Sequence, residues 1–232
     1  MIVLLVLLKV RFWLKTAKFK NTLLCISAYL VPNSISSLGC RKLSLNSAVP
    51  AAFQPVIPPP TPTAPDGMSC DLTAVEECVR WITAPICLRS TVVPGTCDRL
   101  AAATGRPLAF SPEYLGESSA HPWREDAACG FLIVGGPDPI IDLVKSAYAA
   151  PAPNLKIHRA TALEAELCKY MENCFLATKV AFVNQFYDIA AAHGANFEAV
   201  RQLWLADPRV GESHTVVTPE RGFRGRCLPK DV

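Results

Sequence analysis

The first 65 of the 232 residues contain no aspartate or glutamate. They hold seven of the 23 lysines and arginines, so the rest of the chain is net negative although the whole carries a charge of +3. Beyond position 65 the basic residues are interspersed with acidic ones, and this excludes the basic face of a nucleic-acid-binding protein. The asymmetry indicates two segments of different origin.

Long hydrophobic runs are missing as well. The apolar stretches 1–8 and 23–31 are shorter than the roughly 18 to 20 residues that a helix needs to span a bilayer. We therefore expect no membrane partner. A small membrane protein anchored by residues 1–31 is disfavoured by the same lengths.

Residues 1–56 allow two interpretations. Their basic residues follow the first apolar run, whereas a secretory signal begins with its charges. Lysine, arginine and serine without acids are typical of an organelle transit peptide. The alternative, which we favour, is a mis-assigned start from a frameshift or a wrong exon. A proline-rich linker over 56–65 leads from this segment into a globular part, and we expect it to be extended.

Metal-ligand spacings are also lacking. The ten cysteines form no C-x-x-C pair, and the four histidines are scattered singly, so we expect no metal site. Cys168 and Cys174 lie within apolar helical pattern, which is typical of small buried hydrophobes. Reduced thiols in a cytoplasmic compartment fit this usage better than a disulfide framework does.

Strand and helix patterns alternate through the globular part. Helical patterns cover 72–82, 96–104, 139–147, 162 to about 193, and 197–206, and strand patterns cover 90–96, which ends in a turn, 108–110 and 131–136. Asp71 stands where it would be the N-cap of the first helix. The alternation predicts an α/β fold with a largely parallel sheet, in which ligands bind beyond the carboxyl ends of the strands.

The longest helical pattern has no glycine or proline until Gly194. Its stretch 174–183 is apolar on almost every side, which predicts burial in a core or a subunit interface. Glu166, Lys169 and Asn173 form one narrow polar stripe, because they are three and four residues apart. Burying such groups costs free energy unless they find partners. The alternative is an ordinary salt bridge between Glu166 and Lys169 on a solvated face.

The last residues place one cysteine, Cys227, in a glycine-containing turn four residues before Asp231. The neighbouring Arg226 and Lys230 favour the thiolate and so lower the pKa of the thiol. A cysteine nucleophile needs such an environment. Alone, the same pattern also fits a surface turn with an unreactive thiol.

Six segments in order carry a resemblance to a known family. They are 61–63 (TPT) with Asp66 and Gly67, 90–96 (STVVPGT), 111–117 (SPEYLGE), 166–173 (ELCKYMEN), 207–211 (DPRVG) and 222–231 (GFRGRCLPKD). From about residue 58 to the end, the chain resembles the UDP-glucose/GDP-mannose dehydrogenase family.

The resemblance implies a fold and a reaction. The fold is α/β, with a partial Rossmann-like NAD-binding domain over 57–155 and a central helical dimerisation domain over 156–232, while 1–56 is unmatched. The reaction is a four-electron oxidation of the C6 alcohol of a UDP-sugar to a carboxylate with two NAD. UDP-glucose, which would yield UDP-glucuronate, is the expected substrate, and GDP-mannose and UDP-N-acetyl-mannosamine are the alternatives.

The resemblance also implies a role for each matched residue. Cys227 attacks the aldehyde intermediate to give a thiohemiacetal and then a thioester, and Lys169 and Asn173 stabilise the oxyanion. Glu113 and Asp231 serve acid–base chemistry and thioester hydrolysis. Cofactor contacts are expected from Thr61, Pro62, Thr63, Ser90, Thr91 and Glu117. Substrate contacts are expected from Glu113, Tyr114, Leu115, Lys169, Asn173 and Arg209.

Arg209 resembles an arginine that reaches the substrate of the neighbouring subunit, so a homodimer built on the long helix is implied. Without the family context, three of these residues have simpler readings. Glu113 would be a turn carboxylate, Asp231 a solvated acid near the chain end, and Arg209 a cap of the preceding helix.

The chain departs from the family pattern in three places. It has no Gly-x-Gly-x-x-Gly turn to hold a pyrophosphate on a helix N-terminus. It ends at Val232, before the family's nucleotide-binding domain. Arg224 stands where the family's turn usually has glycine, whose backbone freedom it lacks. We therefore expect a fragment, truncated at both ends, that is inactive alone. The alternative is a non-catalytic dimerisation partner or a relic.

Overall fold

The structure is a computed structural model that describes residues 61–66, 69–82, 84–114, 123, 126–149, 152–223 and 228–232. The unmatched segment 1–56 lies outside these residues. The described residues form two compact units: unit 1 comprises those within 61–64 and 70–169, and unit 2 comprises those within 65–69 and 170–232. The predicted domain boundary between 155 and 156 stays a prediction.

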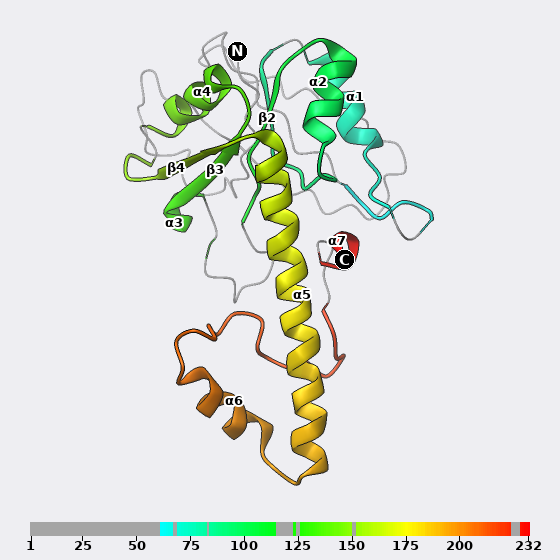
Figure 1. Cartoon of the computed structure of the whole chain (residues 1–232), viewed down its shortest axis with the longest axis vertical. Helices are drawn as coiled ribbons and strands as arrows, with labels where there is room; N and C mark the ends of the chain where they lie inside the picture. The colour runs from blue at the N-terminus through cyan, green and yellow to red at the C-terminus, as the bar shows by residue number, and fades with distance from the viewer. Residues whose placement is uncertain are drawn as a thin grey trace, which may run out of the picture. The chain divides into compact units, whose positions relative to one another are not determined.

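Unit 1 is built on a four-stranded sheet (Figure 1). Its strands are β1 (Ile86–Leu88), β2 (Leu108–Phe110), β3 (Phe131–Gly135) and β4 (Lys156–Ala160), in that spatial order. β1 and β2 are parallel, as are β3 and β4, but β2 and β3 pair antiparallel through Phe110 and Gly135. The sheet is therefore largely parallel, as predicted, with one antiparallel residue pair between β2 and β3.

A glycine allows β2 and β3 to meet in this way. Gly136 has a φ of +141°, and a Cβ there would lie 2.8 Å from the Cα of Ala109 on β2. A side chain at this position would collide with the neighbouring strand, so only glycine fits the close approach. The paired glycines at the end of the β3 pattern are thus a packing requirement.

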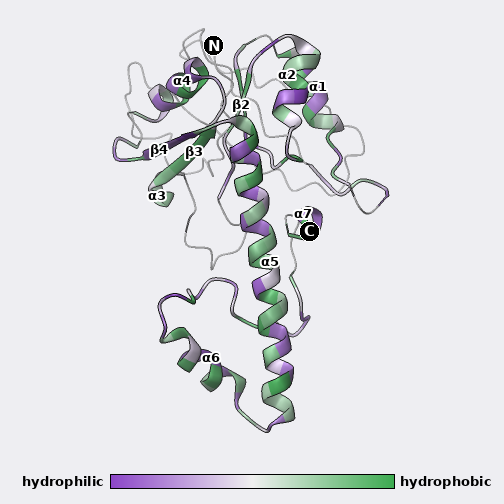
Figure 2. Cartoon of the chain, viewed as in Figure 1, coloured by the Kyte–Doolittle hydropathy of each residue, from purple (hydrophilic) through white to green (hydrophobic). Residues whose placement is uncertain are grey.

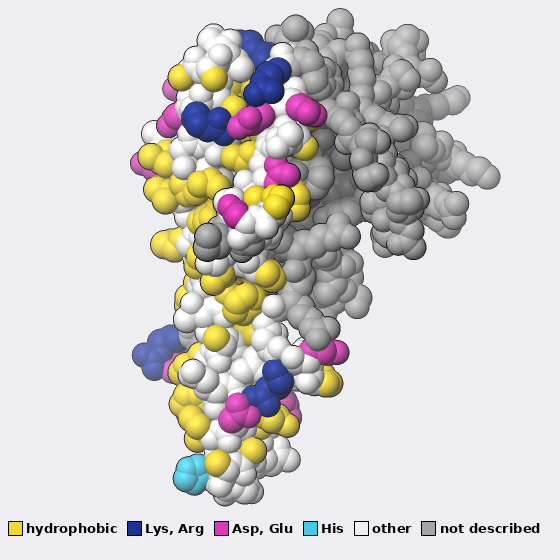
Figure 3. Space-filling model, turned by 90° about the vertical axis from the view of Figure 1, so that its right-hand side faces the viewer, with side chains coloured by type: hydrophobic (Ala, Val, Ile, Leu, Met, Phe, Trp, Pro, Cys, Tyr) yellow, Lys and Arg dark blue, Asp and Glu magenta, His cyan; other side chains and the backbone are white. Residues whose placement is uncertain are grey.

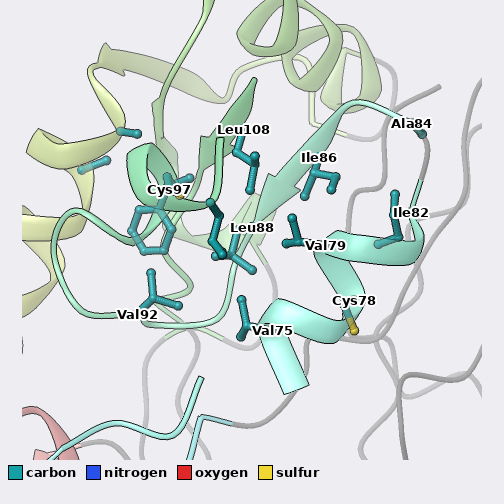
Figure 4. Packing of buried hydrophobic residues seen from close by; sticks show 14 residues of the cluster. Val75, Cys78, Val79, Ile82, Ala84, Ile86, Leu88, Val92, Cys97 and Leu108 are labelled. Atoms are coloured by element: carbon teal, nitrogen blue, oxygen red, sulfur yellow. The ribbon is translucent and has the colours of Figure 1, made fainter. Parts of the chain in front are cut away.

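Both faces of the sheet are covered by helices, because alternate strand residues point to opposite sides. Ile86, Leu88, Leu108 and Phe110 pack with α1 (Thr73–Trp81), α2 (Thr96–Thr104) and the start of α5 (Ala162–Ala192). Cys87, Ala109, Leu132 and Val134 pack with α4 (Asp138–Tyr148) on the other face. Figure 4 shows Val75 and Val79 of α1 directed toward Ile86 and Leu88 of β1.

Most predicted elements are confirmed within a residue or two. The bounds of α2 agree with the prediction, and α5 and α6 (Phe197–Leu205) end one residue earlier than expected. The strand predicted at 90–96 is wrong, because the strand is 86–88 and the following residues form an irregular loop. β4 and the short helices α3 (Asp126–Cys129) and α7 (Leu228–Asp231) were not predicted.

The start of α1 differs slightly from the expected cap. The N-cap position is Leu72, which makes no side-chain cap. Asp71, one residue earlier, accepts a hydrogen bond from the Thr73 amide at 2.9 Å, and the Thr73 bonds lower its pKa. The predicted residue therefore caps the helix from outside the N-cap position.

The long helix α5 does not bury its apolar stretch within this single chain. Phe175 is 63% exposed and Phe182 is 43% exposed, whereas Ala177 and Val183 are buried. Figure 2 shows hydrophobic residues along the second half of α5 and on α6, and Figure 3 shows hydrophobic side chains at the surface there. Of the two predicted settings, burial in a core of this chain is wrong for Phe175 and Phe182, and burial in a subunit interface stays a prediction.

Six cysteines in the described part of the chain lie outside any disulfide, and two of them, Cys87 and Cys97, are buried. Cys78 is disulfide-bonded, so the expectation of reduced thiols fails at that residue. Among the helices that the structure describes, none is both long and apolar enough to cross a membrane.

Candidate functional site

In unit 1, α5 presents a buried lysine to an aromatic ring. Lys169 is 8% exposed, and its ammonium lies 4.5 Å from the centroid of the Tyr114 ring. Tyr114 follows β2 and is itself buried against Phe131 of β3, with ring centroids 5.2 Å apart. An aromatic face stabilises a desolvated cation, so the ring offsets part of the cost of burying Lys169.

The predicted cofactor residues Ser90 and Thr91 lie in the loop that follows β1. Ser90 is buried and Thr91 is partly buried. Thr61 donates a hydrogen bond from its hydroxyl to the carbonyl of Thr91 at 3.0 Å. Two residues predicted to contact the cofactor, 30 positions apart, are therefore brought together at the carboxyl end of a strand, where α/β folds bind ligands.

The segment that carries Thr61 is fixed to the start of α1. The amide of Asp71 donates to the carbonyl of Pro62 at 2.8 Å, and Thr63 forms an isolated antiparallel bridge with Cys70. The three predicted cofactor residues of this segment thus lie on a short hairpin-like turn. Glu113, predicted to serve acid–base chemistry, follows β2 and is half-buried.

Glu166 does not form the salt bridge with Lys169 that the spacing allowed. Its carboxylate accepts hydrogen bonds from the amides of Gly95 at 2.6 Å and Cys97 at 2.9 Å. These amides begin α2. The polar stripe of α5 is therefore buried and partnered rather than solvated.

In unit 2, three residues form a second buried polar group. Asn173 donates from Nδ2 to Oδ2 of Asp231 at 2.6 Å, and Lys230 forms an ion pair with Oδ1 of the same carboxylate. The side chain of Asp231 is fully buried, and that of Lys230 is 5% exposed. The backbone carbonyl of Asp231 also accepts a bond from the Cys174 thiol at 3.3 Å. The reading of Asp231 as a solvated acid is wrong.

The sequence pattern gave Lys230 a role only in lowering the pKa of the Cys227 thiol. Its buried pairing with Asp231 makes it a member of this polar group. The signal in the sequence is the adjacency of a lysine and an aspartate at the end of the cysteine turn. Adjacency alone does not predict an ion pair, because neighbouring side chains usually point in different directions.

Arg209 lies in the turn that follows α6, and its side chain is 88% exposed. Its guanidinium binds the Asp207 carboxylate, with Nε 3.0 Å from each carboxylate oxygen. These hydrogen bonds raise the pKa of Arg209 and lower that of Asp207. The side chain thus bonds a carboxylate rather than the terminal carbonyls of α6, as a helix cap would.

Two other cations hold the segment that carries Arg209. Lys179 of α5 donates to the carbonyls of Val210 at 2.9 Å and Gly211 at 2.6 Å. Arg201 of α6 is buried and donates from Nε to the carbonyl and hydroxyl of Thr215. Neither residue was predictable from the sequence, since a lysine and an arginine on amphipathic helices have no distinguishing spacing.

Several predicted site residues lie outside the described residues: Leu115, Glu117 and Cys227, together with Arg224. In the part of the chain that the structure describes, no group of three or more histidine, cysteine, aspartate or glutamate side chains is arranged to hold a metal ion.

A family model and several known proteins match the chain. Residues 163–232 match the UDP-glucose/GDP-mannose dehydrogenase family, central domain. The UDP-glucose 6-dehydrogenase of Rickettsia conorii is 31% identical over 157 residues, which are 63% of this chain and 34% of that protein. The GDP-mannose 6-dehydrogenase of Pseudomonas syringae is 33% identical over 160 residues, or 63% of this chain and 35% of that protein.

A solved structure agrees with these sequence matches. The UDP-glucose dehydrogenase of Pyrobaculum islandicum superposes with a TM-score of 0.63 at 30% identity, covering 74% of this chain and 42% of that one. The chain thus spans well under half the length of these relatives. The expected α/β, Rossmann-type fold with a long central helix is confirmed by this likeness. Residues 163–232 thus match the central domain of the UDP-glucose/GDP-mannose dehydrogenase family, and the matched part of the chain is similar to several dehydrogenases of nucleotide sugars.

Proposed function

We propose that this chain carries part of the catalytic site of an NAD-dependent nucleotide-sugar 6-dehydrogenase that acts on UDP-glucose. The observation that supports the proposal most is the set of buried polar groups on α5. Lys169 and Asn173 are each less than a tenth exposed, and both are residues to which the family resemblance gives a role in the oxidation. A helix that serves only packing gains nothing from burying these groups.

Lys169 supplies a fixed positive charge. Oxidation of an aldehyde through a cysteine adduct develops negative charge on the former carbonyl oxygen, and a preorganised cation in a poorly solvated site stabilises that charge strongly. The Tyr114 ring lies 4.5 Å from the ammonium and offsets part of the cost of burying it.

Asn173 is oriented by Asp231. One N–H of its amide goes to the carboxylate, which leaves the second N–H as a donor for an oxyanion. Lys230 pairs with the same carboxylate, whose oxygens have acceptor capacity beyond these two bonds. Asp231 is thus suited to hold the amide in place and to orient the hydrolytic water.

The covalent steps rest on Cys227. Its thiolate would add to the C6 aldehyde, and the new carbon–sulfur bond would give a thiohemiacetal. The family resemblance assigns stabilisation of its oxygen to Lys169 and Asn173. Loss of hydride from C6 converts this adduct to a thioester. Water then adds to the thioester carbonyl, the carbon–sulfur bond breaks, and the products are a carboxylate and the free thiolate. Each oxidation removes two electrons, so conversion of the alcohol to the carboxylate requires two successive oxidations.

The residues present fit part of an NAD molecule. The loop after β1 offers the buried Ser90 and the Thr91 backbone, held by Thr61, at the strand end where dinucleotides bind. The sequence has no glycine-rich turn for the pyrophosphate. NAD, when bound, accepts hydride from C6 in each oxidation. The residues described here fit the nicotinamide end of the cofactor.

We further propose a homodimer formed through α5, in a cytoplasmic protein. Leu167, Met171 and Phe175 are 51%, 72% and 63% exposed and recur every four residues, so they line one side of the helix. An exposed apolar stripe of this kind marks an interaction surface. In a dimer, Arg209 would serve the substrate of the neighbouring subunit, as the family resemblance implies.

Alkylation of Cys227 tests the catalytic assignment without requiring turnover. Iodoacetamide labelling is followed peptide by peptide by mass spectrometry, with and without UDP-6-aldehydo-glucose. We expect the aldehyde to slow alkylation of Cys227 at least about tenfold, a difference of about 1.4 kcal/mol, and to leave the half-buried Cys129 unaffected. The matched aldehydes of GDP-mannose and UDP-N-acetyl-mannosamine test the alternative substrates.

Variants assign the protection to the oxyanion residues. Lys169→Met and Asn173→Ala should each weaken protection of Cys227, whereas Lys145→Met, which changes an exposed lysine of α4, should not. Protection by none of the three aldehydes contradicts the proposal and favours a non-catalytic dimerisation partner.

A further inference from the structure

Glu166 is a fully buried acid that the proposed chemistry does not use. It lies in the first part of α5 within unit 1, and none of its surface is exposed. Burying a carboxylate costs several kcal/mol unless other groups replace its hydration. Its position therefore requires partners that matter to the fold or to the site.

The partners are the first amides of α2. Oε2 accepts from the amide of Gly95, and Oε1 accepts from the amide of Cys97. The N-cap residue of α2 is Gly95, with a φ of +89° and no side chain to act as a cap. Glu166 thus supplies, from 71 residues away, the acceptor that a serine or aspartate would normally provide.

Glu166 also lies at the positive end of a helix dipole. Its two oxygens accept from amides at the N-terminus of α2, where an acidic group is stabilising. Burial first and the neighbouring Glu166 second raise the pKa of the Cys97 thiol. The carboxylate is therefore enclosed by the first amide donors of α2.

The same bonds fix the loop that carries the candidate cofactor residues. Loop 90–95 connects β1 to α2, and Thr91 near its start is held by Thr61. At its other end, the amide of Thr96 donates to the carbonyl of Val93 at 3.1 Å, and Glu166 binds the amides on either side of Thr96. Glu166 is three residues before Lys169 on α5, which is less than one turn.

We propose that Glu166 is a positioning residue that fixes loop 90–95 to the turn of α5 that carries Lys169. The loop with the candidate nicotinamide contacts and the helix with the candidate oxyanion cation are then held by one side chain. This role rests on the proposed function, because it explains why a carboxylate is buried between those two elements.

The variant Glu166→Gln tests the role, because it keeps the size of the side chain and removes its charge. NMR amide signals of Gly95 and Cys97 report the two bonds. We expect both signals to move upfield and both amides to exchange with deuterium at least about tenfold faster, as loss of a charged hydrogen bond allows. NAD itself, titrated while the Thr91 amide is observed, should bind about tenfold more weakly.

Two further variants keep the test decisive. Glu164→Gln is the matched control, because Glu164 accepts from the Thr161 amide at the start of α5 and does not contact loop 90–95. This variant should leave the amide signals and exchange rates of Gly95 and Cys97, and the affinity for NAD, unchanged. Glu166→Asp retains the charge and should recover part of the NAD affinity, and it serves if Glu166→Gln does not fold.

The outcomes separate this role from the proposed function. Unchanged exchange at Gly95 and Cys97, or equally faster exchange throughout unit 1, overturns the positioning role. Unchanged NAD affinity in Glu166→Gln, with both amide bonds lost, also overturns it. If the unsubstituted chain binds no NAD while its two amide signals respond as expected, the cofactor assignment of the proposed function fails and the fixation of the loop stands.

Discussion

Unit 1 and unit 2 are stabilised by different kinds of contact. Unit 1 packs hydrophobic clusters against both faces of its sheet. In the described part of unit 2, the buried apolar residues are Ala177, Val183 and Ala190, while Asn173, Arg201, Thr215 and Asp231 are buried polar groups. Its larger apolar side chains, such as Phe175 and Leu203, are mostly exposed.

This difference indicates which unit depends on a partner. Apolar burial contributes about 25 cal/mol per Å², so unit 1 has a source of stability within the chain. Unit 2 holds its segments by ion pairs and by bonds to backbone carbonyls, whose net contributions are smaller. We infer that unit 2 gains its remaining stability when the exposed side of α5 is covered by a second copy.

The largest effect is expected from a cavity in unit 1. Phe110 is completely buried in β2, and Phe110→Ala should lower the free energy of unfolding by about 3 to 5 kcal/mol. Urea denaturation followed by circular dichroism measures the loss. The matched change in unit 2, Phe182→Ala, removes a ring that is 43% exposed and should cost less than half as much at low protein concentration. Equal losses of unfolding free energy in the two variants would contradict the proposed difference between the units.

A charge on the exposed side of α5 should act on association instead. Phe175→Asp places a carboxylate on the proposed dimer surface, and we expect the dimer dissociation constant to rise about 100-fold, or about 2.7 kcal/mol. Sedimentation equilibrium measures it. Leu143→Asp changes a residue of α4 that is 40% exposed in unit 1 and should leave association unchanged. A monomeric parent chain would refute the proposed dimer.

Arg201 tests the polar contacts of unit 2. Its guanidinium joins α6 to Thr215 and pairs with Glu198 and Glu212. Arg201→Met should lower local stability by about 2 kcal/mol, because buried acceptors lose their donor while the two exposed glutamates return to water. Faster hydrogen exchange over 207–216 measures this loss.

The control for Arg201→Met is an exposed arginine that also pairs with two acidic residues. Arg159 pairs with Asp138 and Asp142 and is 42% exposed. Arg159→Met should cost less than about 1 kcal/mol, as exposed ion pairs do. If it costs as much as Arg201→Met, burial is not what makes the unit 2 contacts effective.

The elements that the sequence predicted well have clear local signals. α2 is bracketed by Gly95 and Gly105, both with positive φ, and α5, which lacks glycine and proline, ends at Ala192, two residues before Gly194. β4 was missed because Lys156, His158 and Arg159 make it mostly polar, as suits an edge strand with exposed residues. Its pairing with β3 depends on the fold rather than on its own residues.

The site was predictable from its motifs but not in its contacts. The stripe of Glu166, Lys169 and Asn173 was visible in the spacing, and its burial follows from the apolar residues around it. Its partners were not visible, because Gly95 and Asp231 lie 71 and 58 residues from the groups they bind. Helical spacing allowed a local salt bridge as the alternative, and the fold supplied backbone amides instead.

The smallest effect is expected at Arg209, where the contacts of unit 2 are exposed. The Arg209 side chain first, and its backbone amide second, lower the pKa of Asp207. Arg209→Gln removes the first cause and keeps the second, so the pKa should rise part of the way to its ordinary value. Carbon NMR titration of the Asp207 carboxyl measures this, and Asp71, whose pKa is lowered by Thr73, should not move.

The sign of the pH effect follows from that direction. A carboxyl whose pKa is lowered in the folded state stabilises the fold above its unfolded pKa, and this contribution is lost as the pH falls through the folded value. The parent chain and Arg209→Gln should therefore differ only above the folded pKa and become equal in more acidic solution. Because Arg209 is 88% exposed, salt should remove most of the difference at neutral pH. A difference that persists at high salt would mean that Arg209 has a buried partner, which is the behaviour expected if it reaches into a neighbouring subunit.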